Sequence, residues 1–298
     1  MVSRRKFLKK SSLITGSVVT GGLFLHACKD TSSSPGPDSK IGLQLYTIRD
    51  AMDENPEKSL ARVAELGYDE VESATYTGTG KFYGMTGQEF DEVLRKNGLS
   101  IPSGHYLLGS EEIRGTILSD WEQAVEDAAT IGMKYMVCAW LPEEQRETID
   151  HYKQVAEWLN HAGEICKNNG IQLCYHNHEF EFEELSGQIP YELLLQDMEE
   201  DLVKMELDIY WTVYAGYDPV DLFQKNKGRY VLWHVKDMAD SPDRSFTEVG
   251  NGTIDWNRLF QYSEVAGMKH FFVEQDVSES PFDSIEQSIT YIKERVNI

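Results

Sequence analysis

Two histidines spaced two residues apart, His176 and His178, are the first residues in this sequence whose types and spacing indicate chemistry. They lie in the segment Leu173–Glu179, which follows a helix-ending Gly170 and begins with apolar residues, as a buried strand does. Side chains two apart in a strand point to the same face, so Cys174 shares a face with both histidines. Two imidazoles there could bind a metal or transfer protons. They could equally be hydrogen-bonded core residues.

Carboxylates end two other apolar segments. Asp208 follows Met205–Leu207, and Glu274 follows Phe271–Val273. An unpaired carboxylate is costly to bury, so carboxylates and imidazoles that converge at one place would require a cation. Two of each suit one divalent ion such as Mn²⁺, Co²⁺, Zn²⁺ or Mg²⁺, although imidazole ligands argue modestly against Mg²⁺ and Ca²⁺. The alternative is a plug of polar side chains hydrogen-bonded to one another.

The elements that must position these residues form a repeated pattern of apolar strand, turn and amphipathic helix. The predicted strands are Ile41–Thr47, Tyr68–Ser73, Ile101–Tyr106, Lys134–Trp140, Ile171–His176, Lys204–Tyr210, Tyr230–Lys236 and His270–Gln275. The predicted helices are 56–66, 87–97, 119–131, 148–168, 190–200, 219–226, 255–266 and 282–295. Six inter-strand helices end at a glycine suited to a left-handed C-cap, namely Gly67, Gly98, Gly132, Gly170, Gly228 and Gly267.

Eight such units in a row predict an α/β fold, a (β/α)₈ TIM barrel, over residues 41–298. An open doubly wound sheet would need a glycine-rich turn after its first strand, and Thr47–Asp50 is not one. Active sites of (β/α)₈ barrels lie at the C-terminal ends of the strands. The candidate residues at that rim are Gln44, Tyr46, Arg49, Glu70, Glu72, His105, Trp140, His176, His178, Glu206, Asp208, His234, Lys236, Asp237, Glu274 and Asp276. Three further histidines, His151, His161 and His270, fall on helices or at a strand start and are expected to be structural.

Residues 1–27 are predicted to be a signal peptide rather than part of the fold. A basic head precedes a short apolar run, and Ser3–Lys9 matches the twin-arginine export signal. Leu25–Cys28 is similar to a lipobox, so we expect a lipid-modified Cys28 followed by a flexible tether over residues 28–40. The predicted product is a periplasmic or cell-envelope lipoprotein. The alternative is a plain cleaved signal with a coincidental cysteine.

The charge of the chain limits its partners. The formal net charge is −22, and removal of the five basic residues of the signal takes it to −27. Such a surface repels nucleic acid and anionic lipid, so we expect no nucleic-acid partner and membrane attachment only through Cys28. The three later cysteines, Cys138, Cys166 and Cys174, are odd in number and sit largely in apolar segments, which favours buried thiols over disulfides.

Several motifs together resemble the sugar-phosphate isomerase/epimerase superfamily, the xylose-isomerase-like barrels that include ketose 3-epimerases and inosose dehydratases. The motifs are Gly42–Thr47, Tyr175–His178, Leu207–Asp208, His234–Asp237, Val249–Asp255 and Val273–Asp276. The resemblance covers residues 41–298. It implies one divalent metal held by His176, Asp208, His234 and Glu274. Ketose epimerases have a glutamate where this chain has His176, which weakens the case for epimerisation by two opposed carboxylates.

The resemblance implies an enzyme that removes a proton beside the carbonyl of a keto-sugar and forms a metal-stabilised enediolate. Glu274 is then the candidate base, His178 and Lys236 are candidates for proton transfer, and Lys236 and His105 for contacts to substrate oxygens. Isomerisation or epimerisation would follow reprotonation, whereas loss of a β-leaving group would make the protein a dehydratase or a 3-keto-glycoside lyase. Aromatic side chains at the rim, such as Trp140 and Tyr46, could stack on a sugar.

Two other classes of protein are alternatives to a sugar-modifying enzyme. Metal-dependent phosphodiesterases that act on abasic DNA share the fold, but they need a basic surface and this one is acidic. A non-catalytic sugar-binding lipoprotein would not need four convergent ligands. Barrels of this type often pair, so the resemblance also implies a homodimer.

Overall fold

The computed structural model describes residues 40–74, 76–78 and 80–298. The predicted signal peptide, the predicted lipid attachment at Cys28 and all of the predicted tether except Lys40 lie outside these residues. Within them, no helix is both long and apolar enough to cross a membrane.

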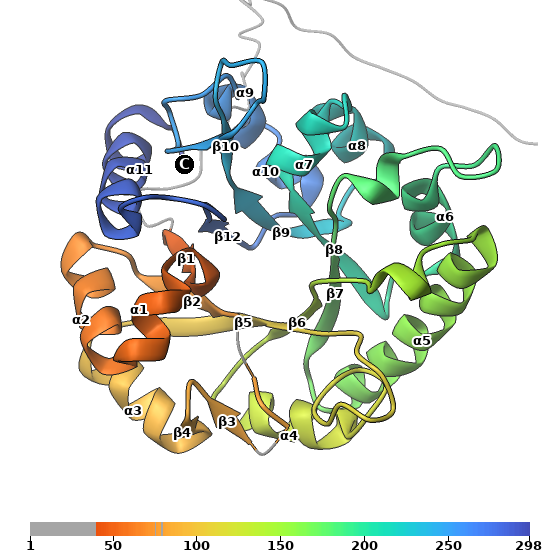
Figure 1. Cartoon of the computed structure of the whole chain (residues 1–298), viewed down its shortest axis with the longest axis horizontal. Coiled ribbons are helices and arrows are strands. Elements are labelled where there is room, and N and C mark those ends of the chain that lie inside the picture. Colours follow the sequence, from red (N-terminus) through yellow and green to blue (C-terminus); the bar gives the residue numbers. More distant parts are fainter. Residues whose placement is uncertain (1–39, 75, 79) are drawn as a thin grey trace, which may run out of the picture. The chain divides into compact units, whose positions relative to one another are not determined.

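Eight parallel strands close into a barrel, and the helices lie outside the ring of strands (Figure 1). This confirms the predicted (β/α)₈ fold. Hydrogen bonding joins the strands in the order β1-β12-β9-β8-β7-β6-β5-β2, and β1 pairs with β2 to close the ring. The barrel strands are β1 (Gly42–Gln44), β2 (Glu70–Ser73), β5 (Ser100–Tyr106), β6 (Tyr135–Cys138), β7 (Gln172–His176), β8 (Val203–Asp208), β9 (Tyr230–Val235) and β12 (His270–Val273).

The outer layer consists mainly of the helices that follow these strands. They are α2 (Pro56–Leu66), α3 (Gly87–Lys96), α4 (Trp121–Thr130), α5 (Ile149–Asn168), α6 (Pro190–Asp197), α8 (Pro219–Lys225), α9 (Trp256–Phe260), α10 (Ser263–Ala266) and α11 (Pro281–Arg295). Local sequence sets their ends. Thr86 and Glu89 form a capping box at the start of α3, and all six predicted C-cap glycines have positive φ.

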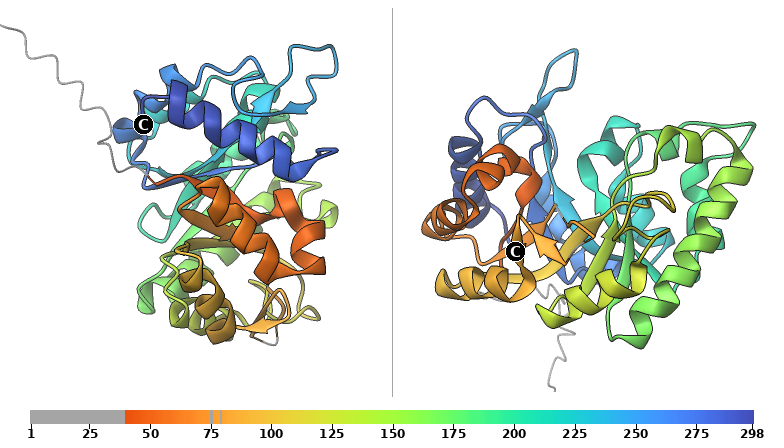
Figure 2. Two further views of the ribbon diagram at one scale, coloured as in Figure 1. Left: turned by 90° about the vertical axis from the view of Figure 1, so that its left-hand side faces the viewer. Right: turned by 60° about the horizontal axis from the view of Figure 1, so that its bottom comes forward.

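The last helix, α11, lies beside the first part of the barrel, as Figure 2 shows. Lys293 Nζ donates to the carbonyl of Gly67 at 2.8 Å, and Tyr68 Oη donates to the carbonyl of Ile285 at 2.8 Å. The core between strands and helices is apolar. Cys138, Cys166 and Cys174 are buried free thiols, as predicted.

The structure corrects several predicted boundaries. The first strand ends at Gln44, because the Gln44 side chain accepts a hydrogen bond from the backbone N–H of Tyr46 and starts a 3₁₀ helix, Leu45–Ile48. The sixth strand ends at Asp208, which caps α7 (Ile209–Tyr214). The predicted helix 255–266 is two short helices, α9 and α10. Sequence analysis missed α1 (Arg49–Glu54), the other 3₁₀ helices Glu143–Gln145 and Phe180–Phe182, and the hairpins β3 (Lys81–Phe82)/β4 (Met85–Thr86) and β10 (Asp237–Met238)/β11 (Phe246–Thr247).

Candidate metal centre and substrate cavity

Three of the predicted metal ligands meet at the C-terminal ends of neighbouring strands. Asp208 ends β8 and stands opposite His234 of β9, and Glu274 follows β12 on the other side of β9. His234 Nδ1 lies 2.7 Å from Glu274 Oε2, and one ligand atom from each residue lies within 4.8 Å of the other two. All three side chains are buried. A single ion with bonds of about 2.1 Å could therefore be reached by all three after small side-chain adjustments.

The fourth predicted ligand, His176 at the end of β7, adjoins this group. Its Nε2 lies 3.7 Å from Asp208 Oδ2, and its Nδ1 lies 3.0 Å from Glu206 Oε2. The structure thus brings together all four side chains that the resemblance implied. Burial lowers the pKa of His176 well below its ordinary value and outweighs the neighbouring Glu206, so the imidazole is neutral, as a metal ligand must be.

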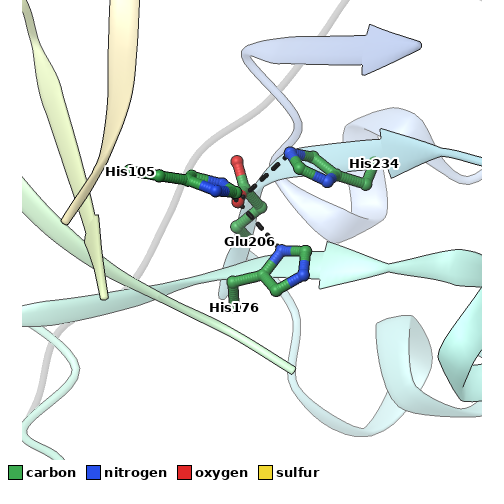
Figure 3. A group of neighbouring side chains, drawn as sticks. All are labelled: His105, His176, Glu206 and His234. Carbon is green, nitrogen blue, oxygen red and sulfur yellow. Dashed lines mark hydrogen bonds and ion pairs between the residues drawn. The ribbon is translucent and has the colours of Figure 1, made fainter. Parts of the chain in front are cut away.

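A second group of ionisable residues lies next to the first and shares His176 and His234 with it. The rings of His105, His176 and His234 surround the carboxylate of Glu206 (Figure 3). Glu206 Oε2 lies 2.7 Å from His105 Nε2 and 3.3 Å from His234 Nε2. Glu72 completes the group, with Oε2 at 2.7 Å from His234 Nε2 and 3.2 Å from His105 Nε2. The sequence placed Glu72 and Glu206 at the rim but assigned them no role.

The two groups divide the nitrogens of His234 between them. Nδ1 faces Glu274, whereas Nε2 faces Glu72 and Glu206. A histidine that binds a metal through one nitrogen commonly donates a hydrogen bond from the other to a carboxylate, which fixes the ring and its tautomer. We therefore interpret Glu72 and Glu206 as the carboxylates that orient the predicted ligands. Gln44 Nε2 donates to Glu72 at 2.8 Å and fixes that carboxylate in turn.

A buried lysine neutralises the carboxylates of the site. Lys236 Nζ lies 2.9 Å from Asp208 Oδ2, 2.8 Å from Glu274 Oε2 and 3.1 Å from Asp276 Oδ1. Burial opposes its charge, but these three carboxylates outweigh burial and raise the pKa of Lys236 well above its ordinary value. Burial would raise the pKa of Glu274 too, yet Lys236 and His234 hold it well below its usual range. The site therefore contains an ammonium and an ionised carboxylate in contact.

Two further histidines of the site have opposite charge states. Burial opposes protonation of His105, but Glu72 and Glu206 raise its pKa to about 9, so it is an imidazolium at neutral pH. Burial and the nearby Lys236 lower the pKa of His178 to about 3, so it is neutral. His178 Nδ1 and Trp211 Nε1 are buried and have no hydrogen-bond partner within the described part of the chain. Since both residues line a cavity, a ligand can satisfy these atoms.

A cavity of about 810 Å³ opens above these residues. Its wall includes the four predicted catalytic residues, His105, His178, Lys236 and Glu274. His176 also reaches it, whereas Asp208 and His234 do not line it. The cavity is a size that suits small-molecule ligands.

Comparison with known proteins identifies the family of the chain. Residues 60–295 match the model of the xylose isomerase-like TIM barrel family. The chain belongs to this family. It is 27% identical over 203 residues to an inosose dehydratase from Geobacillus kaustophilus, a match that covers 60% of this chain and 61% of that protein. The chain thus spans about three-fifths of the length of that curated relative.

Solved structures show the same fold. A sugar phosphate isomerase/epimerase from Parabacteroides distasonis has a TM-score of 0.76 and 28% identity, covering 90% of this chain and 98% of that one. The fold is also shared by the IolI protein with a bound zinc atom, at 17% identity and a TM-score of 0.68, covering 85% of this chain and 97% of that one. The predicted similarity to sugar phosphate isomerase/epimerase and inosose dehydratase proteins is confirmed.

In this family member, the motif Tyr175–His178 builds the site from both faces of β7. Asn177 Oδ1 accepts from the backbone N–H of Asp208 at 3.1 Å and so positions that residue. Tyr175 Oη donates to Glu181 Oε1 at 2.5 Å, and the backbone N–H of His178 donates to Glu181 Oε2 at 2.8 Å. Glu181, which sequence analysis missed, is fully buried and fixes the turn that carries His178.

Two residues predicted at the rim do not contribute to the site. Glu70 lies at the opposite end of the barrel, and Asp237 has a structural role. Glu70 lies at the N-terminal end of the barrel, where it pairs with His270 at 2.6 Å and Lys40 at 3.0 Å, so its placement at the rim was wrong. Two residues along a strand cover about 6.7 Å, which separates Glu70 from Glu72 by a layer of the barrel. Asp237 is buried and structural. Its carboxylate accepts from the backbone N–H groups of Met238, Gly250 and Ile254 and from Trp256 Nε1.

Proposed function

We propose that this protein is a divalent-metal-dependent enzyme that acts on a keto-sugar or sugar derivative by proton transfer beside the carbonyl, as isomerases and epimerases do. The observation that carries the proposal is the convergence of His176, Asp208, His234 and Glu274 at the base of the cavity, with Lys236 in contact with both carboxylates. The family of the chain and its sugar isomerase and dehydratase relatives support it.

The donor set fits a divalent metal. It combines two buried imidazoles with two buried carboxylates. Asp208 Oδ2 accepts no hydrogen bond from the described residues. The ammonium of Lys236 lies 2.9 Å from this oxygen. Such a mixed set suits Mn²⁺, Co²⁺ or Zn²⁺, and Mg²⁺ less well. An ion held by His176, Asp208, His234 and Glu274 would polarise the carbonyl of the substrate and make the adjacent C–H more acidic.

The residues that line the cavity supply the remaining chemistry. Glu274 is ionised and reaches both the predicted ligands and the cavity, so it is the base that accepts the proton from carbon. Lys236, as an ammonium 2.8 Å from Glu274, stabilises negative charge that develops on a substrate oxygen. The neutral His178 is suited to hydrogen bonding with a substrate hydroxyl, because its buried Nδ1 has no hydrogen-bond partner among the described residues.

Elimination is the second candidate reaction, either as a dehydratase or as a 3-keto-glycoside lyase. One observation favours it. An epimerase with two carboxylate bases needs one on each side of the substrate, and here the position on β7 is the neutral His176, held by Glu206. A single carboxylate, Glu274, suffices to remove a proton before a β-leaving group departs.

Incubation with panels of ketoses and 3-keto-glycosides in heavy water tests the proposal. We expect solvent deuterium at the carbon beside the carbonyl, in a reaction that a chelator stops and Mn²⁺, Co²⁺ or Zn²⁺ restores. The identity of the product separates epimerisation from elimination. Failure of any divalent ion to co-purify or rebind would overturn the metal-enzyme proposal and favour the sugar-binding lipoprotein instead.

We also propose that the chain is exported by the twin-arginine route and anchored through a lipid on Cys28, as its N-terminal sequence predicts. Fractionation of cells that express the full chain tests this. The wild type should be found in the membrane fraction, and a Cys28→Ala variant should not be lipid-modified. A twin Arg4→Lys, Arg5→Lys variant should stay in the cytoplasm, and its normal export would exclude the route.

A further inference from the structure

Apolar side chains gather around the mouth of the substrate cavity. In the described part of the chain, the exposed large hydrophobic residues are Tyr46 (43% exposed), Leu107 (50%), Ile113 (52%), Trp140 (41%) and Val277 (66%). The first four line the cavity, and Val277 follows Asp276, which also lines it. The chain has 50 acidic residues, so a group of exposed apolar side chains at one rim contrasts with its overall composition. Such a group marks a binding surface.

The exposed aromatic rings at this mouth are held in place. Trp140 packs edge-on against His178 at 4.8 Å and Phe180 at 5.4 Å between ring centroids, and the Arg146 guanidinium lies 3.8 Å from the Phe180 ring. Tyr46 has the Arg49 guanidinium 4.3 Å from its ring centroid. Arg49 Nη1 in turn donates to the carbonyls of Tyr46 and Asp276. Rings fixed in this way can bind a flat ligand face with little loss of side-chain entropy.

The cavity is larger than the proposed reaction centre needs. Its volume of about 810 Å³ lies near the upper end of the range for small-molecule sites. A hexose has only 12 non-hydrogen atoms and would be held at the inner end, among His178, Lys236 and Glu274. The exposed side chains of Leu107, Ile113 and Trp140 line the outer end and offer apolar surface there.

We propose that the mouth of the cavity is a second subsite, which binds an apolar ring face attached to the sugar. The substrate would then be a glycoside with a ring-bearing aglycone rather than a free monosaccharide. This inference rests on the proposed function, since the sugar half occupies the site described above. The chemistry of the occupant follows from the residues that line the mouth, because an aromatic aglycone can cover the Trp140 ring while its outer edge stays in water.

Paired ligands that need no turnover test the subsite. Phenyl and methyl β-glycosides of glucose and of galactose, each in the ordinary and the 3-keto form, are titrated against the metal-loaded protein and followed by tryptophan fluorescence and calorimetry. We expect the phenyl member of at least one pair to bind about tenfold more tightly than the methyl member, the effect of roughly 60 Å² of ring surface leaving water. Lack of any phenyl preference in every pair overturns the proposal.

Substitutions at the mouth of the cavity show which side chains cause the tighter binding of phenyl glycosides. In the double variant Leu107→Ala, Ile113→Ala, the phenyl advantage should fall about fivefold while methyl glycoside binding stays unchanged. Val277→Ala is the matched control, because Val277 is exposed at the same rim but does not line the cavity, and it should leave both affinities unchanged. A wild-type dimer that the double variant converts to a monomer in sedimentation would show that a second copy covers this surface, and would overturn the subsite.

The binding results for the subsite can be separated from the results for the proposed reaction. If no glycoside or ketose is turned over but the phenyl preference is present and lost in the double variant, the subsite stands and the proposed reaction fails. If ketoses exchange deuterium normally but no phenyl preference exists, the reaction stands and the subsite fails.

Discussion

His234 Nε2 lies 2.7 Å from Glu72 Oε2, although their strands, β9 and β2, are not neighbours in the barrel. The other nitrogen of the same ring lies 2.7 Å from Glu274. The imidazole is therefore fixed from one side by a carboxylate that does not reach the cavity, while its second nitrogen is directed toward the predicted metal ligands. Glu72 thus orients His234 without touching substrate.

We expect Glu72→Ala to lower metal affinity about 10–100-fold, the usual cost of losing a carboxylate that orients a histidine ligand. Glu72→Gln keeps an acceptor oxygen for His234 and should lose less. Competition titrations against a chelator with Zn²⁺ and Mn²⁺ measure both, and thermal unfolding shows whether each barrel is intact. Wild-type affinity in a folded Glu72→Ala protein would exclude this orienting role.

Two Glu–His pairs with buried carboxylates, at opposite ends of the barrel, allow a matched test of the catalytic base. Glu274 pairs with His234 at the C-terminal end, and Glu70 pairs with His270 at the N-terminal end, at 2.7 and 2.6 Å. We expect Glu274→Gln to reduce the rate of deuterium incorporation by at least about 10²-fold, because the carboxylate that accepts the proton is gone. Glu70→Gln removes an equally buried carboxylate far from the cavity and should leave the rate within about twofold.

NMR detection of deuterium in the recovered sugar measures both variants, and metal analysis shows how much ion each one retains. His234→Ala should likewise abolish turnover while the barrel still folds. Near-normal exchange by Glu274→Gln or His234→Ala would show that the ligand and base assignments are wrong.

The sequence predicted the repeating fold, because that fold follows from periodic local signals. The four convergent side chains were implied by the resemblance to a known superfamily. Glycine at a helix C-cap and two-residue alternation in strands can be recognised without tertiary information. The layers within the barrel could not be predicted in the same way. Glu70 and Glu72 have the same spacing as Glu206 and Asp208, and only the register between strands shows that Glu70 lies at the far end of the barrel.

Some missed features did carry a signal. Asp208 followed by Ile209–Trp211 has the pattern of an N-cap, and Asp208 Oδ1 accepts from the Trp211 backbone N–H at 2.9 Å. Glu181 gave no comparable signal, because it lies beyond the end of β7 and its two donors come from a tyrosine on the outer face of the strand and from a backbone N–H.

Glu181 predicts a pH dependence of stability. Burial raises its pKa to about 7, although hydrogen bonds from Tyr175 and His178 favour the ionised form. A carboxyl group whose folded pKa lies above its ordinary value of 4.5 binds its proton more tightly in the folded state. Its contribution to stability is therefore complete below about pH 4.5 and is lost as the pH rises through about 7. The loss is on the order of 3 kcal/mol for a shift of this size.

We expect Glu181→Gln to flatten this dependence. Urea unfolding between pH 4.5 and 8 should show the free energy of unfolding of the variant rising relative to the wild type as the pH increases. Glu183→Gln, which removes an exposed carboxylate two residues away, is the control and should leave the pH profile unchanged. A constant difference between Glu181→Gln and the wild type across this range would contradict the raised pKa.

Gly252 is predicted to be required for the loop between β11 and α9. A Cβ atom at this position would lie 2.1 Å from Asp237 Oδ1 and 2.4 Å from the carbonyl oxygen of Met238. Asp237 cannot move away, because its carboxylate already accepts hydrogen bonds from Gly250, Ile254 and Trp256. We expect Gly252→Ala to destabilise the protein by about 1–3 kcal/mol, as overpacking of a well-packed region does.

Because Asp237 directly follows Lys236, the same substitution should reduce activity as well as stability. Urea unfolding gives the stability, and amide hydrogen exchange should show faster exchange at Gly250 and Ile254, whose N–H groups bind Asp237. Asn251→Ala, at the exposed neighbouring position, is the control. If Gly252→Ala matched the wild type in both measurements, the close contact with Asp237 would not constrain this loop.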